Sequence, residues 1–135
     1  RIKLESITPE EIQFEKDLHV IQEKDGRTDT LYNIGRDFTI MHLKLDLVLA
    51  NLQSDHFVLA IQDDELSIDQ DMMHLIDFIE AGSKLTPPII YTIGDKLAIF
   101  DGKQQISLCR HLNIETMPFL VRHLGVDKVQ SLLRM

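Results

Sequence analysis

The residues best suited to chemistry are those at 101–105, Asp-Gly-Lys-Gln-Gln, which lie between an apolar run and an amphipathic one. A glycine between a strand and a helix lets backbone N–H groups approach an anion closely, and the positive end of the helix dipole favours negative charge. We therefore predict a phosphate or anion site made of Gly102, Lys103, Gln104 and Gln105. The alternative is a helix start without a ligand, in which Asp101 caps the helix.

Acidic side chains are densest between an apolar run at 57–61 and the helix expected after it. The simpler interpretation is a solvated turn followed by helix-capping acids, and we assign neither a catalytic residue nor a metal site to this cluster. The alternative is a divalent-metal site that uses two or three of these carboxylates. The cluster consists of Asp63, Asp64, Glu65, Asp69 and Asp71.

Cys109 is the only cysteine, so no intrachain disulfide and no multi-cysteine zinc site can form. It falls on the apolar side of an expected helix, where a thiol is usually an inert core residue. The six histidines show no pair at i,i+4 spacing and no zinc signature. We therefore expect no resident metal, and a cytoplasmic location suits the reduced thiol.

The charge is negative overall and unevenly distributed. The chain of 135 residues carries a net charge of −8, which opposes long-range attraction to nucleic-acid phosphates. Residues 101–135 alone hold five Lys or Arg against three acids, so the candidates for nucleic-acid contact are Arg110, Arg122 and Lys128. No apolar stretch approaches the roughly 20 residues that cross a bilayer, so no membrane partner is expected.

Signals for helices and strands are clearest in the C-terminal half. Asp69 and Gly82 bound a helix with one apolar stripe, and residues 89–93 and 96–100 form a hairpin around a Gly-Asp turn. A helix is expected from 101 to Asn113, followed by a strand at 119–121 and a last helix that begins near residue 126.

The N-terminal half carries weaker signals. Thr8 and Pro9 are typical of a helix start. Residues 31–52 show both helical and alternating spacing of apolar residues, and their length and their Leu, Met, Lys and Ala content predict a helix. The residues at 57–61 predict a strand. The expected fold is α/β (α+β), a small mixed sheet with flanking helices at 57–135, preceded by an extension or added subdomain at 1–56.

The order of motifs from Leu85 to Pro118 resembles the ParB/sulfiredoxin-like superfamily. These motifs are a Pro-Pro-Ile-Ile strand, a hairpin, the box at 101–105, a helix and Thr-Met-Pro, with Gly102 sixteen positions before Pro118 as in ParB-type sequences. The resemblance covers residues 57–122 and implies a ParB-like fold. It also implies a box that binds nucleotide phosphates in ParB proteins, carries the catalytic cysteine in sulfiredoxin, and supports kinase or nuclease-like activities in other relatives.

The box departs from this family pattern at the residues that carry its chemistry. Lys103 stands at the place of the sulfiredoxin cysteine, Gln104 and Gln105 replace His or Arg, and Ser107 replaces the last Arg of the ParB box. A neutral amide cannot reproduce the bidentate grip of a guanidinium on phosphate. The leading hypothesis is therefore a non-catalytic ParB-like domain with a DNA-linked or transcription-regulating role, within a complex that supplies the contacts to DNA.

Two other functions stay open. A nucleotide-dependent kinase, phosphohydrolase or nuclease-like enzyme would hold the phosphates of a nucleotide through Lys103 and the amides after Gly102. Glu65 or Asp101 would then assist a catalytic base or Mg²⁺, and the resemblance suggests Glu65 because an acid after the first strand assists chemistry in some relatives. A protein-interaction module would form a homodimer through residues 1–56. Nucleotide titration and sedimentation separate these alternatives from the leading hypothesis.

Overall fold

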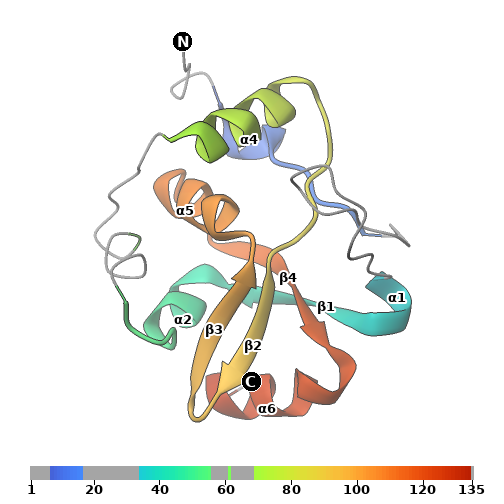
Figure 1. Ribbon diagram of the computed structural model, residues 1–135, viewed down its shortest axis with the longest axis vertical. Coiled ribbons are helices and arrows are strands. Elements are labelled where there is room, and N and C mark those ends of the chain that lie inside the picture. The colour runs from blue at the N-terminus through green and yellow to red at the C-terminus, as the bar shows by residue number, and fades with distance from the viewer. Residues whose placement is uncertain (1–6, 17–33, 56–60, 62–68, 135) are drawn as a thin grey trace.

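The computed structural model describes residues 7–16, 34–55, 61 and 69–134, which form a four-stranded sheet with helices packed against it (Figure 1). The strands are β1 (Phe38–Lys44), β2 (Ile89–Ile93), β3 (Lys96–Asp101) and β4 (Thr116–Arg122). The α-helices are α1 (Ile34–Asp37), α2 (Leu45–Ala50), α4 (Gln70–Glu80), α5 (Lys103–His111) and α6 (Val126–Leu133). Short 3-10 helices are η2 (Pro9–Glu11) and η3 (His123–Gly125).

The sheet is assembled from two antiparallel pairs in the order β1-β4-β2-β3. A parallel contact joins the pairs: Ile89 lies opposite Leu120, and the N–H of Leu120 donates to the carbonyl of Pro88 at 2.7 Å. This mixed sheet with flanking helices confirms the predicted fold class. The predicted hairpin is confirmed as well, because β2 and β3 pair around the turn at Gly94.

One face of the sheet carries the main core. The register places Met41 of β1 opposite Phe119 of β4 on this face. Buried residues of α2, α5 and α6 pack against these strands. α4 lies on the outer side of α5, where its buried residues form a second cluster with Leu108 of α5 (Figure 1). α5 is thus held between the sheet and α4.

The helix expected at 31–52 is wrong over Phe38–Lys44, which form β1. In the second half of β1, Met41 and Leu43 are buried while His42 and Lys44 are exposed, as expected for a strand with one face against the core. The alternating spacing prevails because every residue of β1 finds a partner on β4. That pairing outweighs helix propensities, which differ by at most about 0.7 kcal/mol between ordinary residues.

The ends of α4 and α5 follow their sequence signals. The carboxylate of Asp69 accepts a hydrogen bond from the N–H of Met72 at 2.9 Å and so caps α4 as predicted. Gly82 follows α4 with a φ of +80°, and Asn113 follows α5 with a φ of +58°. The predicted last strand and last helix are confirmed as β4 and α6. The predicted stripe of α4 is buried at Met72, Ile76 and Ile79.

The N-terminal region contributes to the same sheet as the rest of the chain. β1 belongs to the expected region 1–56 and β4 to 57–135, and the two strands pair along their whole length. The helix expected after Thr8 is a single 3-10 turn, in which the Glu11 carboxylate accepts the N–H of Thr8 at 3.0 Å. The strand expected at 57–61 lies outside the described residues except for Ile61, which has helical backbone and is buried.

Candidate functional site

The turn between β3 and α5 depends on Gly102. Its φ of +94° lies in the left-handed region, which favours glycine. A Cβ at this position would lie 2.7 Å from both Cα and Cβ of Pro88, which is too close for any real side chain. Gly102 is therefore required both by its backbone conformation and by the close approach of the turn to the segment that leads into β2.

Asp101 is not the residue that caps α5, contrary to the sequence-based expectation. It ends β3, and its carboxylate accepts a hydrogen bond from the N–H of Gly102 at 2.9 Å. Gly102 occupies the N-cap position and has no side chain with which to accept bonds from the first turn. The Asp101 carboxylate thus stabilises the turn ahead of the helix.

The first turn of α5 presents backbone N–H groups and a positive side chain. The first hydrogen bond within the helix runs from the N–H of Ile106 to the carbonyl of Gly102 at 3.1 Å. The N–H groups of Lys103, Gln104 and Gln105 belong to the first turn and precede this bond along the chain. The turn contains no acidic residue, and Lys103 is exposed. Together with the helix dipole, this arrangement favours an anion such as a phosphate group.

The four predicted site residues are consecutive, so the structure keeps them together, but they differ in exposure. Gly102 is buried, Lys103 is exposed, and Gln104 and Gln105 are half-buried. The Oε1 atom of Gln105 is itself buried and has no hydrogen-bond partner among the described residues. An exposed lysine and backbone amides can therefore reach a ligand, whereas the amide of Gln105 is partly withdrawn from solvent.

A small hollow of 140 Å³ borders Lys103 at the outer edge of β3, and we call it the edge hollow. It forms where residues 51–53 run beside β3, with the N–H of Gln53 donating to the carbonyl of Leu97 at 2.7 Å. Its volume is below the roughly 300 Å³ of typical small-molecule sites, so it suits a phosphate group better than a whole nucleotide. It is lined by Leu52, Gln53, Asp55, Tyr91, Ala98, Ile99 and Lys103.

Sequence reasoning missed the neighbours of Lys103 that come from other elements. Gln53 and Asp55 follow α2, and Tyr91 lies in the middle of β2. No local motif marks these residues, because they reach the edge hollow only through the pairing of residues 51–53 with β3. Asp55 is exposed and adds a negative charge to the lining of the edge hollow, which weakens the attraction for an anion.

The three candidates for nucleic-acid contact lie on different elements. Arg110 is in the last turn of α5, and Lys128 is on α6, which lies well apart from α5 in Figure 1. Arg122 ends β4, and its guanidinium lies 5.3 Å from the centre of the Phe38 ring, a cation–π contact with the sheet. The structure therefore does not bring the three side chains into one basic patch.

The acidic candidates are only partly within the described residues. Asp69 serves as the cap of α4, whereas Asp63, Asp64 and Glu65 lie outside the described residues. Among the residues that the structure describes, no group of three or more His, Cys, Asp or Glu is placed to hold a metal ion. The role considered for Glu65 stays a prediction.

Cys109 lies in the main core, and burial raises the pKa of its thiol from 9.0 to about 12. A thiol that is buried and protonated is a poor nucleophile, which agrees with the inert core role expected for it. We expect the folded chain at pH 8 to react with Ellman's reagent more than about 100-fold more slowly than the urea-unfolded chain. Rapid reaction of the folded chain would contradict this placement.

The same thiol makes stability depend on pH in the alkaline range. Between pH 9 and 12 the folded chain keeps this proton while the unfolded chain loses it, so the free energy of unfolding falls as pH rises. The thiol contributes fully to stability below pH 9. Above that pH the free energy of unfolding falls with a slope that approaches about 1.4 kcal/mol per pH unit. Urea titrations of the Cys109→Ala variant should show a shallower alkaline decline than those of the parent chain.

The fold and the turn after Gly102 together define a small mixed α+β domain with a candidate anion site at a helix start. No protein-family model matches the chain, and searches of curated proteins and of solved structures returned no match. The resemblance to the ParB/sulfiredoxin-like superfamily therefore stays a prediction. Within the described parts of the chain, no helix is long and apolar enough to cross a membrane.

Proposed function

We propose that this chain is a non-catalytic regulatory domain that binds a phosphate-bearing ligand at the turn after Gly102. The observation that carries the proposal is the start of α5, where backbone N–H groups, a helix dipole and exposed Lys103 coincide without an acid in the first turn. Such a helix start attracts anions through both its N–H groups and its dipole. The resemblance to ParB-type sequences, in which the corresponding box binds nucleotide phosphates, supports the same site.

The side chains around this turn support binding without catalysis. Lys103 offers a flexible point charge, and Gln104 and Gln105 are neutral, so a transferring phosphoryl group would lack the guanidinium clamp typical of phosphoryl-transfer sites. The carboxylate of Asp101 is engaged by the N–H of Gly102. This bond gives Asp101 a structural role in the turn, which is compatible with a non-catalytic site.

We place the domain in a DNA-linked setting in which other chains contact the nucleic acid. The net charge of −8 and the spread of Arg110, Arg122 and Lys128 over different elements disfavour tight binding of DNA by this chain alone. The single cysteine is buried and suits the reducing conditions of the cytoplasm. The motif order that resembles ParB-type sequences motivates the link to DNA.

Calorimetric titration tests the proposed site with CTP, ATP and inorganic pyrophosphate, each with Mg²⁺. We expect saturable binding, with an affinity that falls about fivefold in Lys103→Ala. An affinity loss of about fivefold corresponds to the upper end of the free energy measured for one exposed ion pair. Lys128→Ala is the matched control, because it removes an exposed lysine from α6. Its affinity should stay within about twofold of the parent value.

Three results would overturn the proposal or a part of it. Absence of heat and of a thermal shift at millimolar concentrations of all three anions would remove the phosphate site. Nucleotide hydrolysis that Asp101→Asn abolishes would replace the non-catalytic role with an enzymatic one. Tight binding of duplex DNA at physiological salt that survives Lys103→Ala and Arg110→Ala would contradict the delegation of DNA contact to partner chains.

A further inference from the structure

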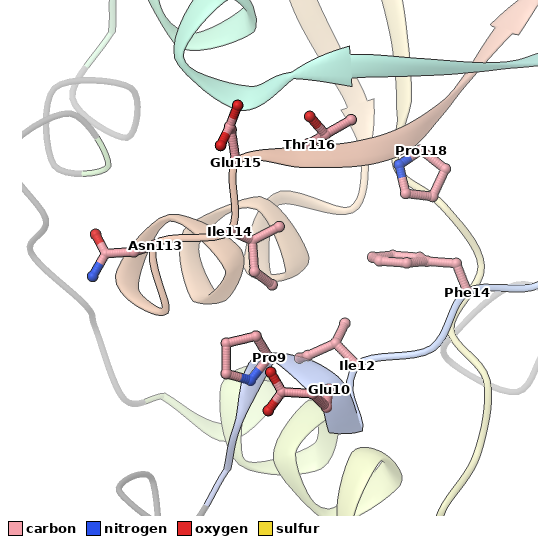
Figure 2. A pocket seen from close by; sticks show the side chains of 9 residues that line it. All are labelled: Pro9, Glu10, Ile12, Phe14, Asn113, Ile114, Glu115, Thr116 and Pro118. Carbon is pink, nitrogen blue, oxygen red and sulfur yellow. The ribbon is translucent and has the colours of Figure 1, made fainter.

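A second and larger depression lies between the N-terminal segment at 9–14 and the connection from α5 to β4, and we call it the apolar groove. It has a volume of 440 Å³. Figure 2 shows the side chains of Ile12, Phe14 and Ile114 pointing toward one another across it. Its lining residues are Pro9, Glu10, Ile12, Phe14, Asn113, Ile114, Glu115, Thr116 and Pro118.

Backbone hydrogen bonds hold both walls of the apolar groove. On the N-terminal side, the N–H of Glu15 donates to the carbonyl of Leu85 and the N–H of Leu85 donates to the carbonyl of Gln13, both at 2.7 Å. On the other side, the carbonyl of Glu115 accepts the N–H of Leu45 at 2.8 Å. Because these hydrogen bonds hold the walls in place without a partner, the groove loses little conformational entropy when a partner binds.

The charges at the apolar groove are of one sign. Glu10 and Glu115 are exposed, one on each wall, and none of the described residues that line the groove is basic. The Glu115 carboxylate points away from the centre of the groove, whereas the apolar side chains point into it (Figure 2). The groove thus combines an apolar interior with a negative rim, inside a chain whose net charge is −8.

We propose that the apolar groove docks a segment of a partner protein in which an apolar side chain is flanked by lysine or arginine. The apolar side chain would enter between Ile12, Phe14 and Ile114, and the cations would pair with Glu10 and Glu115. Its volume lies within the range of about 300–1,000 Å³ found for binding sites, which is enough for a few side chains. Opposite charges at a rim raise the association rate and select against acidic partners.

Fluorescence anisotropy tests the docking site on the full 135-residue chain. The probe is a short fluorescein-labelled peptide in which lysine alternates with leucine and phenylalanine. The double variant with Glu10→Gln and Glu115→Gln should bind it about tenfold more weakly, the combined effect of two exposed ion pairs. The matched control carries Asp95→Asn and Asp127→Asn, which remove two exposed acids from the β2–β3 turn and from α6. The control should keep the parent affinity within about twofold.

A second peptide separates docking from general attraction to an acidic chain. An otherwise identical peptide with serine in place of leucine and phenylalanine should bind at least about tenfold more weakly, because it has no side chain for the apolar interior. Equal binding of the serine peptide, or an unchanged affinity of the glutamine variant, would overturn the proposal. A parent dimer in sedimentation that the glutamine variant abolishes would assign the groove to a second copy of this chain instead.

Discussion

Replacing Gly102 with alanine is expected to lower the free energy of unfolding by about 2–5 kcal/mol. Two causes add: a residue with a Cβ is strained by about 1–2 kcal/mol in the left-handed region, and overpacking against Pro88 costs about 1–3 kcal/mol. The φ of +94° and the 2.7 Å approach to Pro88 identify both causes at this one position. Urea unfolding of parent and variant measures the difference.

Gly94 provides the matched control for this prediction. It also has a positive φ, +62°, but a Cβ there would meet nothing within 4 Å. Gly94→Ala should therefore show only the conformational cost of about 1–2 kcal/mol. Equal costs for the two variants would mean that the turn shifts away from Pro88 without penalty, and the close packing inferred for Gly102 would be wrong.

Replacing Phe119 with alanine is expected to lower the free energy of unfolding by about 3–5 kcal/mol. Phe119 is completely buried at the centre of β4, opposite Met41, and faces the main core shared with α2, α5 and α6. Removal of its ring leaves a cavity that strands on either side cannot easily close. Chemical denaturation followed by far-UV circular dichroism measures the loss.

Two companion variants keep this prediction testable even where alanine unfolds the chain. Phe119→Leu conserves most of the volume and should cost less than about 1.5 kcal/mol. Phe100→Ala removes the same ring from a side chain that is 61% exposed, and its effect should stay within about 0.5 kcal/mol. A loss below about 1 kcal/mol for Phe119→Ala would contradict its position in the core.

The proposed anion site and the proposed docking groove lie at opposite ends of α5 and can be tested independently. Lys103 belongs to the first turn, whereas Asn113 and Ile114 of the groove follow the last turn. Lys103→Ala should leave peptide binding unchanged, and the glutamine variant of Glu10 and Glu115 should leave phosphate binding unchanged. Failure of one proposal therefore says nothing against the other.

Local signals in the sequence were sufficient for several features whose cause is itself local. The carboxylate of Asp69 caps α4 through the N–H of Met72, three residues away. Gly82 and Asn113 end their helices because both residue types tolerate a positive φ. The hairpin at Gly94 likewise depends on residues that adjoin the turn. Each of these features needs only a few consecutive residues.

Only part of the candidate site could be predicted from the sequence. The run at 101–105 marks a strand, a turn and a helix start, and these lie where they were expected. The N-cap assignment of Asp101 was wrong by one residue, because β3 extends through Asp101 and leaves Gly102 at the cap position. Gln53, Asp55 and Tyr91 could not be assigned to the site, because no nearby residues signal that 51–53 run beside β3.

The sequence by itself therefore determined the small mixed α+β class, the hairpin, the caps of α4 and the glycine turn before α5. Only the tertiary structure decided that 38–44 is a strand, that Gly102 packs on Pro88, and that an apolar groove forms between 9–14 and 113–118. The physical reason is the distance along the sequence between the residues that stabilise each feature. Caps and turns are stabilised by neighbours a few residues away, whereas strand pairing, close packing and grooves are stabilised by segments that only folding brings together.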